Sequence, residues 1–318
     1  MPPGGRGQWS IRNDMHKKEL LKNRGIVLLL AVLCCLLWGS AFPVIKIGYR
    51  ILGIASADAT SQILFAGVRF FLAGILAILL GSILQKKFLF PAKSSWGMIG
   101  ILSLFQTVMQ YLFFYLGLAH ASGVNASIIN GVNTFFAILL ATLARKQERL
   151  TSGKLLGCIL GTAGVVFVSI SGGNVGGGFA LTGEGFIVIA SMSYAVSSVL
   201  MKEYSSHENP VTLSGYQFLV GGAVMMIIGG IAGGNLGSIS AQGLLLILYL
   251  ALVSSVAYSI WGVLLKYNPV SSVAIYGFTT PIFGAMLSAL LLGEWSSVTI
   301  RHVIALALVS IGIYIVNR

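Results

Sequence analysis

The sequence contains very little charge. Only 9% of its 318 residues are Asp, Glu, Lys or Arg, whereas soluble globular proteins carry about 25%. Hydrophobic residues make up 56% of the chain. So few charged side chains cannot cover the surface of a water-soluble fold. The composition therefore predicts an integral membrane protein.

Acidic residues are especially scarce. The chain has eight of them: Asp14, Glu19, Asp58, Glu148, Glu184, Glu203, Glu208 and Glu294. Each falls in a tail, in a loop or at the end of an apolar run, so no carboxylate is expected at mid-depth in the membrane. Coupling of an activity to protons or sodium through a buried acid is therefore not predicted.

Motifs for metal binding and catalysis are also missing. The three cysteines lie in apolar runs, and their odd number argues against a disulfide framework. No His-Glu-x-x-His, Cys-x-x-Cys or Gly-x-x-x-x-Gly-Lys pattern occurs. No nucleophile with a paired base is visible at mid-depth. We therefore expect a protein that is not an enzyme and that needs no cofactor or metal.

Long apolar runs are what the sequence has in abundance. A bilayer core of about 30 Å takes about 20 helical residues to cross. The runs predict an all-α integral membrane protein with ten transmembrane helices: Ile26–Tyr49, Ser61–Leu84, Trp96–Leu118, Ser122–Leu143, Gly153–Ile170, Thr182–Met201, Thr212–Ala232, Gln242–Leu265, Val270–Leu292 and Val298–Val316.

Basic residues set the expected orientation. The formal net charge of +12 would suggest a nucleic-acid partner in a soluble protein. Here most Lys and Arg lie in the N-terminal tail and in alternate loops, which is the positive-inside pattern. We therefore expect a multi-pass protein of the cytoplasmic membrane with both termini in the cytoplasm and no nucleic-acid partner.

The chain carries an internal repeat. An aromatic residue and a lysine stand eight apart in Trp38–Lys46 and again in Tyr194–Lys202. A second pair of similar strings places Arg69 opposite Gln217. The repeat predicts a tail (1–25), a first five-helix repeat (26–171) and a second (182–316). Because five is odd, the repeats would be inverted, as in many secondary transporters; the alternative is a likeness through shared membrane composition.

These strings carry a family resemblance. Trp38-Gly-Ser-Ala-Phe-Pro-Val-Ile-Lys46, Ala66-Gly-Val-Arg-Phe-Phe-Leu-Ala-Gly74 and Glu148-Arg-Leu-Thr151 resemble the drug/metabolite transporter superfamily, in its ten-helix EamA-type branch. Thr279-Thr280-Pro281 is similar to the family's mid-helix proline segment, whereas Phe135 stands where the first half should have that proline. The resemblance implies ten helices around a central cavity that moves small organic solutes.

Polar and aromatic residues within the predicted spans form the candidate substrate site. They are Trp38, Lys46, Arg69, Gln106, Gln110, Asn130, Asn133, Tyr194, Tyr258, Trp261, Tyr276 and Thr280. For any one of them, packing or an interhelical hydrogen bond is the favoured interpretation. For the set, apolar walls with a few placed polar groups are typical of a solute cavity.

Two of these residues are cations. Arg69 lies about 12 Å into its span, and its planar fork suits a carboxylate or phosphate. Alternatively it clamps backbone carbonyls, a role favoured because the resembled family often has arginine here across different substrates. Lys46 lies nearer the outer boundary, where snorkelling is favoured over substrate contact.

The functional hypothesis is a secondary transporter that works by alternating access. Arg69 and Lys46 without opposing acids favour amino acids or other carboxylate-bearing metabolites. The alternatives are an exporter of cationic drugs or toxic metabolites, and a non-transporting membrane scaffold. The expected partners are a small-molecule substrate and membrane lipid, with the chain as a monomer or homodimer.

Overall fold

The computed structural model describes residues 19–55, 57–118, 133–169, 181–293 and 300–318, and this part is helical without any strand. Its elements are α2 (Arg24–Leu52), α3 (Ala59–Gln85), η1 (Lys93–Ser95), α4 (Trp96–Leu102), η2 (Ser103–Met109), α5 (Gln110–Leu118), α7 (Asn133–Leu139), η3 (Leu140–Ala144), α8 (Ser152–Ser169), η5 (Leu181–Gly185), α9 (Phe186–Tyr204), α10 (Pro210–Ile231), α11 (Ala241–Tyr267), α12 (Val270–Ala274), η6 (Ile275–Thr279), α13 (Thr280–Leu292) and α14 (Ile300–Asn317).

Within the described residues, seven helical segments are long and apolar enough to cross a membrane. They comprise α2, α3, the run from η1 into α5, η5 with α9, α10, α11, and the run from α12 to α13. The prediction of an all-α membrane protein is therefore confirmed. Residues 122–132 of the fourth predicted span lie outside the described part of the chain.

Local sequence explains where several helices begin. The Asn23 side chain accepts hydrogen bonds from Gly25 N and Ile26 N at the start of α2. At α10, Asn209 caps Val211 N, and Pro210 occupies the first turn, where its missing N–H costs nothing. These caps satisfy backbone donors that a helix start otherwise leaves without partners.

Four of the predicted spans are not regular α-helices throughout. The fourth and the sixth contain the π-helical segments η3 and η5. The third widens into a π-helix, η2, between α4 and α5. The ninth tightens into a 3₁₀-helix, η6, before α13 restarts at Thr280 with Pro281 in its first turn. Such departures change which side chains point inward, and they recur at functional sites and hinges.

Glycines allow α3 and α10 to touch backbone to backbone. A Cβ at Gly74 would lie 2.5 Å from Leu219 N, and one at Gly222 would lie 2.4 Å from Phe71 N. Gly67 meets Met226 in the same way, so the two helices run antiparallel. Small residues that let backbones approach this closely are the usual basis of tight packing between membrane helices.

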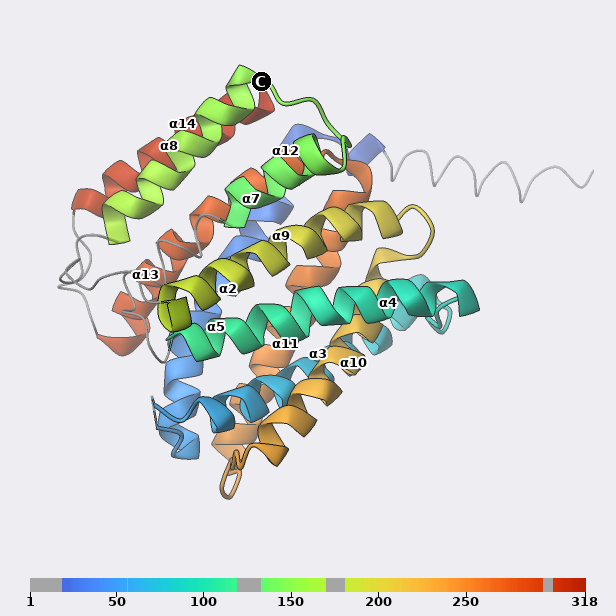
Figure 1. Cartoon of the computed structure of the whole chain (residues 1–318), viewed down its shortest axis with the longest axis vertical. Helices are drawn as coiled ribbons and strands as arrows, with labels where there is room; N and C mark the ends of the chain where they lie inside the picture. Colours follow the sequence, from blue (N-terminus) through green and yellow to red (C-terminus); the bar gives the residue numbers. More distant parts are fainter. Residues whose placement is uncertain (1–18, 56, 119–132, 170–180, 294–299) are drawn as a thin grey trace, which may run out of the picture.

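The contact between α3 and α10, which we call the seam, lies on one side of the other helix contacts. The last helix, α14, lies along α8, and Gly312 approaches Gly157. Between the two glycine contacts, α2 packs against α11 and α13, while α9 packs against α5 and α7. Figure 1 shows α8 with α14 along one edge of the bundle and α3 with α10 toward the opposite one.

One end of the bundle is cross-linked by polar groups. We call it the Arg24 end, because Arg24 and Arg318, from the first and last described helices, line one pocket there. Glu148 accepts a hydrogen bond from Lys154 Nζ at 2.7 Å and further bonds from the hydroxyl and backbone N–H of Ser271. Lys202 Nζ donates to the Asn268 carbonyl at 2.7 Å. These contacts tie loops and helix ends from both halves of the sequence.

Candidate functional site

Arg69 is a buried cation. It belongs to α3 and is only 4% exposed. Its guanidinium carbon lies 4.3 Å from the centre of the Phe70 ring and 5.8 Å from that of Tyr111. In the described part of the chain, the ion pairs are Arg145–Glu203 and Lys154–Glu148. Arg69 therefore has no counter-charge among the residues that the structure describes.

Aromatic rings from five spans meet beside Arg69. This central aromatic cluster consists of Trp38, Phe70, Tyr111, Phe218, Tyr258 and Trp261. Trp38 of α2 packs edge-on against Tyr258 at 5.0 Å and against Trp261 at 4.9 Å, both from α11. The Tyr258 hydroxyl lies 3.0 Å from that of Tyr111 on α5, so the cluster links α2, α5 and α11.

Several buried polar atoms near the cluster have no hydrogen-bond partner among the residues that the structure describes. They include Trp38 Nε1, Trp261 Nε1, Arg69 Nε, Gln106 Oε1 and Gln110 Oε1. A buried polar group without a partner is costly, so such groups normally bind water or a ligand. Here donors and acceptors are both present, which is what an amphipathic solute requires.

The structure brings three more predicted residues to this region. Tyr194 of α9 is buried and lies close enough to Tyr111 and Tyr258 for electrostatic interaction. Gln106 is buried in the π-helix η2, and Gln110 begins α5 and approaches the Tyr258 hydroxyl. Tyr194 and Gln110 therefore lie beside the central aromatic cluster, and Gln106 lies one helical turn before Gln110.

Other predicted residues lie elsewhere. Lys46 is exposed on α2, about 12 Å along the helix axis from Trp38. Tyr276 lines the pocket at the Arg24 end. Asn133 is half-buried in α7, and Thr280 is half-buried near Cys35. Asn130 lies outside the described residues.

The sequence analysis missed four residues of the site: Phe70, Tyr111, Phe218 and Gln217. Phe70 and Tyr111 directly follow Arg69 and Gln110, and Phe218 directly follows Gln217. Gln217 was recognised only as the repeat counterpart of Arg69; its Oε1 accepts a hydrogen bond from Thr107 at 2.7 Å, while its Nε2 has no partner. The repeat alignment was therefore the signal that pointed to Gln217 and Phe218.

The cysteines also have a role that a search for disulfides does not reveal. Cys34 Sγ donates to the Ala257 carbonyl at 3.4 Å, and Cys35 Sγ donates to the Tyr276 carbonyl at 3.3 Å. Both thiols are buried and free. They join α2 to α11 and to η6 directly beside Trp38, and so help to hold the wall of the site.

Glu148 has a perturbed pKa at the Arg24 end. Burial raises the pKa of its carboxyl, but hydrogen bonds from Lys154 and Ser271 outweigh burial, and the net pKa lies below the ordinary value. Glu148 is therefore ionised at neutral pH. It lies in the loop before α8, whereas Ser271 lies in α12, so its charge joins the two halves of the sequence.

Comparison with known proteins identifies the chain's relatives. An uncharacterized transporter from Archaeoglobus fulgidus is 28% identical over 84% of this chain and 89% of its own. A probable amino-acid metabolite efflux pump from Escherichia coli is 27% identical over 90% and 93% of the two chains. A solved crystal structure with 18% identity superposes with a TM-score of 0.74 over 92% and 96%, a likeness of fold alone.

The family match agrees with these relatives. The EamA-like transporter family matches residues 25–170 and 181–318, which is nearly the whole described chain and both predicted halves. The family and the names of the relatives indicate a transporter rather than an enzyme. The chain belongs to the EamA-like transporter family.

Proposed function

We propose that the protein is a secondary transporter that carries amino acids or other carboxylate-bearing metabolites by alternating access, with Arg69 holding the anionic group. The observation that carries the proposal is the burial of Arg69 without a counter-charge in the described chain. A buried charge that lacks a partner is strongly unfavourable. A solute carboxylate supplies the missing charge, and the planar guanidinium can bind it through two hydrogen bonds.

The surroundings of Arg69 suit the rest of such a solute. Rings of the central aromatic cluster provide an apolar wall, and Trp38 Nε1 and Trp261 Nε1 are donors without partners. Gln106 Oε1 and Gln110 Oε1 are acceptors without partners, suited to an ammonium or hydroxyl group. Amino acids have this combination of groups, and the Escherichia coli relative is named a probable amino-acid metabolite efflux pump.

A repeated pattern of helix contacts, as expected of two related halves, supports alternating access. The repeat equates α2 with α9, α5 with α11, and α7 with α13. Under this correspondence, the contact of α2 with α11 matches that of α9 with α5, and the contact of α2 with α13 matches that of α9 with α7. The seam of α3 with α10 and the pair of α8 with α14 each map onto themselves. The family also matches the chain in two stretches that divide it between these halves. Two such halves can exchange roles and open the site to either side.

The competing functions predict different charges and hydrogen bonds around Arg69. A carrier of cationic drugs would have to hold its cargo beside the Arg69 charge, where like charges repel. A scaffold without cargo gains nothing from unpartnered donors and acceptors in its interior. The purely structural role of Arg69 predicts hydrogen bonds from its guanidinium to backbone carbonyls, and in the described part of the chain its Nε makes none.

Counterflow into proteoliposomes tests the proposal. The purified protein is first screened in detergent by thermal shift with amino acids, organic acids, nucleosides and cationic drugs. The solutes that stabilise it are then loaded inside vesicles, and uptake of the labelled solute is measured against protein-free vesicles. We expect uptake of carboxylate-bearing solutes. Uptake of cationic drugs alone, or of no solute in the panel, would contradict the proposal.

A further inference from the structure

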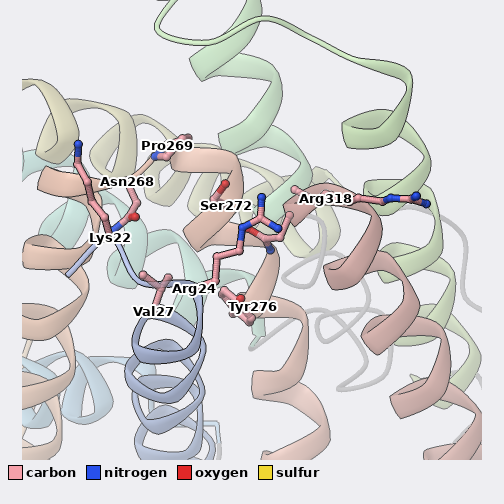
Figure 2. Close-up of a pocket in the computed structure, with 10 residues that line it drawn as sticks. Lys22, Arg24, Val27, Asn268, Pro269, Ser272, Tyr276 and Arg318 are labelled. Carbon is pink, nitrogen blue, oxygen red and sulfur yellow. The ribbon is translucent and has the colours of Figure 1, made fainter. Parts of the chain in front are cut away.

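A polar pocket of about 330 Å³ lies at the Arg24 end, away from the central aromatic cluster. Ten residues line it: Lys22, Arg24, Val27, Asn268, Pro269, Ser272, Tyr276, Val316, Asn317 and Arg318. They come from the segment before α2 and its first turns, the turn between α11 and α12, α12 itself, η6, and the end of α14 with the residue that follows it. Figure 2 shows Arg24 between Tyr276 and Ser272, with Lys22 on one side and Arg318 on the other.

The lining is cationic without an acidic counterpart. Lys22, Arg24 and Arg318 are exposed, and no Asp or Glu is among the described residues that line the pocket. Glu148, on the neighbouring loop, is held by Lys154 and Ser271. Glu19 is exposed before Lys22, and no ion pair in the described chain includes it. The positive potential of the pocket is therefore not neutralised by the described protein groups.

Hydrogen bonds hold this lining in place. Asn268 Nδ2 donates to the Leu21 carbonyl at 2.9 Å and to the Leu264 carbonyl at 3.0 Å, which fastens the segment before α2 to the end of α11. The Asn268 carbonyl in turn accepts from Lys202 Nζ at 2.7 Å. Asn23 caps α2 directly after Lys22. The backbone that carries Lys22 and Arg24 is therefore fixed beside the pocket.

We propose that this pocket binds a phosphate group, and that an anionic phospholipid supplies it as its headgroup. The Arg24 guanidinium lies near the Ser272 hydroxyl (Figure 2), and Lys22 and Arg318 on either side add positive charge, which suits the charge and acceptor oxygens of a phosphate. The pocket lies where α2 and α14 reach the end of the bundle, which is the level of lipid headgroups in a membrane. Val27 and Val316 give it an apolar side suited to the glycerol and first methylenes of a lipid.

The bound headgroup has a structural consequence. Arg24 lies on the first described membrane helix, Tyr276 on η6 and Arg318 at the end of α14. A phosphate held among them joins segments that are otherwise far apart in the sequence. The proposal is independent of the transported solute, because none of these residues belongs to the central aromatic cluster.

Native mass spectrometry of the whole protein tests the proposal. The probes are phosphatidylglycerol, phosphatidylcholine and inorganic phosphate, added separately to delipidated protein in detergent. The variants are Arg24→Gln, the double substitution Lys22→Gln with Arg24→Gln, and Arg50→Gln as control. Arg50 is exposed in the last turn of the same helix at the opposite end. A thermal melt of each variant checks that it is folded.

We expect phosphatidylglycerol to bind more tightly than phosphatidylcholine and to raise the melting temperature. Each removed charge should weaken phosphatidylglycerol binding about fivefold, whereas Arg50→Gln should bind as the wild type does. A third outcome is that inorganic phosphate binds, that the double variant loses this binding, and that no lipid binds selectively. This outcome would support a phosphate site but would show that its ligand is free phosphate rather than a lipid headgroup. Equal phosphatidylglycerol binding by wild type and folded double variant, or equal losses in the control, would overturn the proposal.

Discussion

The two faces of α3 are built in opposite ways. On one face, Gly67 and Gly74, seven residues apart, bring the helix against the backbone of α10. Arg69 lies two residues after Gly67, about 200° around the helix, and presents a buried guanidinium to the aromatic rings. One face is packed without space for a methyl group, and the other carries a polar atom without a partner.

The two faces of α3 therefore have different roles: the glycine face supports the fold, and the Arg69 face belongs to the candidate site. Close backbone packing leaves α3 little freedom to rotate, so the position of Arg69 is fixed by the seam rather than by a protein carboxylate. An unpaired charge is tolerated where the surrounding packing stabilises the helix that carries it. Substitutions on the glycine face should therefore affect folding, and those at Arg69 should affect the handling of solute.

The largest effect is expected from Gly74→Leu. Even its Cβ would lie 2.5 Å from Leu219 N, so α3 and α10 must separate. Overpacking of this kind costs about 3 kcal/mol or more, and we expect loss of the monodisperse peak in size-exclusion chromatography. The control is Gly100→Leu, because a Cβ at Gly100 meets nothing within 4 Å. Equal behaviour of the two variants would show that the seam does not support the fold.

Arg69→Gln should abolish most transport while leaving the protein folded. Loss of a buried charge-assisted contact with the solute corresponds to about a 100-fold decrease in transport efficiency. The melting temperature should stay the same or rise, because an unpaired buried charge is removed. Arg69→Lys keeps the charge but not the two-pronged geometry, so we expect it to restore only part of the activity. Unfolding of Arg69→Gln would instead indicate a structural clamp.

Much of this arrangement followed from the sequence, and some of it could not. Apolar runs identified the helices, because crossing a membrane requires length and hydrophobicity alone. The residues of the third span that face inward were harder to predict from the sequence, because the π-helix η2 changes the register of Gln106. The meeting of Trp38 with Tyr258 depends on how α2 and α11 are rotated, which contacts between distant residues determine. For the same reason, Tyr276 was predicted to lie in the central site, whereas it lines the pocket beside Arg24.

Glu148→Gln should have a moderate effect on stability at the Arg24 end. The variant loses an ionised acceptor for Lys154 and Ser271, which corresponds to about 1–3 kcal/mol. The pKa of Glu148 is lowered on folding, so its contribution is full above the unfolded pKa of about 4.3 and is lost as the pH falls through the folded value.

Thermal melts between pH 7 and pH 3 measure this contribution. The wild type should lose more stability than Glu148→Gln over the acidic part of this range. Glu203→Gln is the matched control, because the Arg145–Glu203 pair is 43% and 40% exposed and contributes about 0–1 kcal/mol. If Glu148→Gln melts at the same temperature as the wild type at pH 7, the contacts of Glu148 with Lys154 and Ser271 do not stabilise this end of the bundle.

The smallest effect is expected from Lys46→Gln. Lys46 is exposed on α2, in contrast to Arg69. Removing an exposed charge should change transport by less than about twofold and leave the melting temperature unchanged. Uptake measurements in proteoliposomes at two salt concentrations would detect any remaining electrostatic role. A decrease as large as that of Arg69→Gln would place Lys46 in the solute pathway.

The charge preference of binding tests the role of Arg69 most directly. The affinities of an amino acid that stabilises the protein and of its carboxamide are measured by isothermal titration calorimetry for the wild type and Arg69→Gln. The account predicts that the wild type prefers the carboxylate by about tenfold or more, and that Arg69→Gln binds the two compounds equally. An unchanged preference for the carboxylate in a folded Arg69→Gln protein would contradict it.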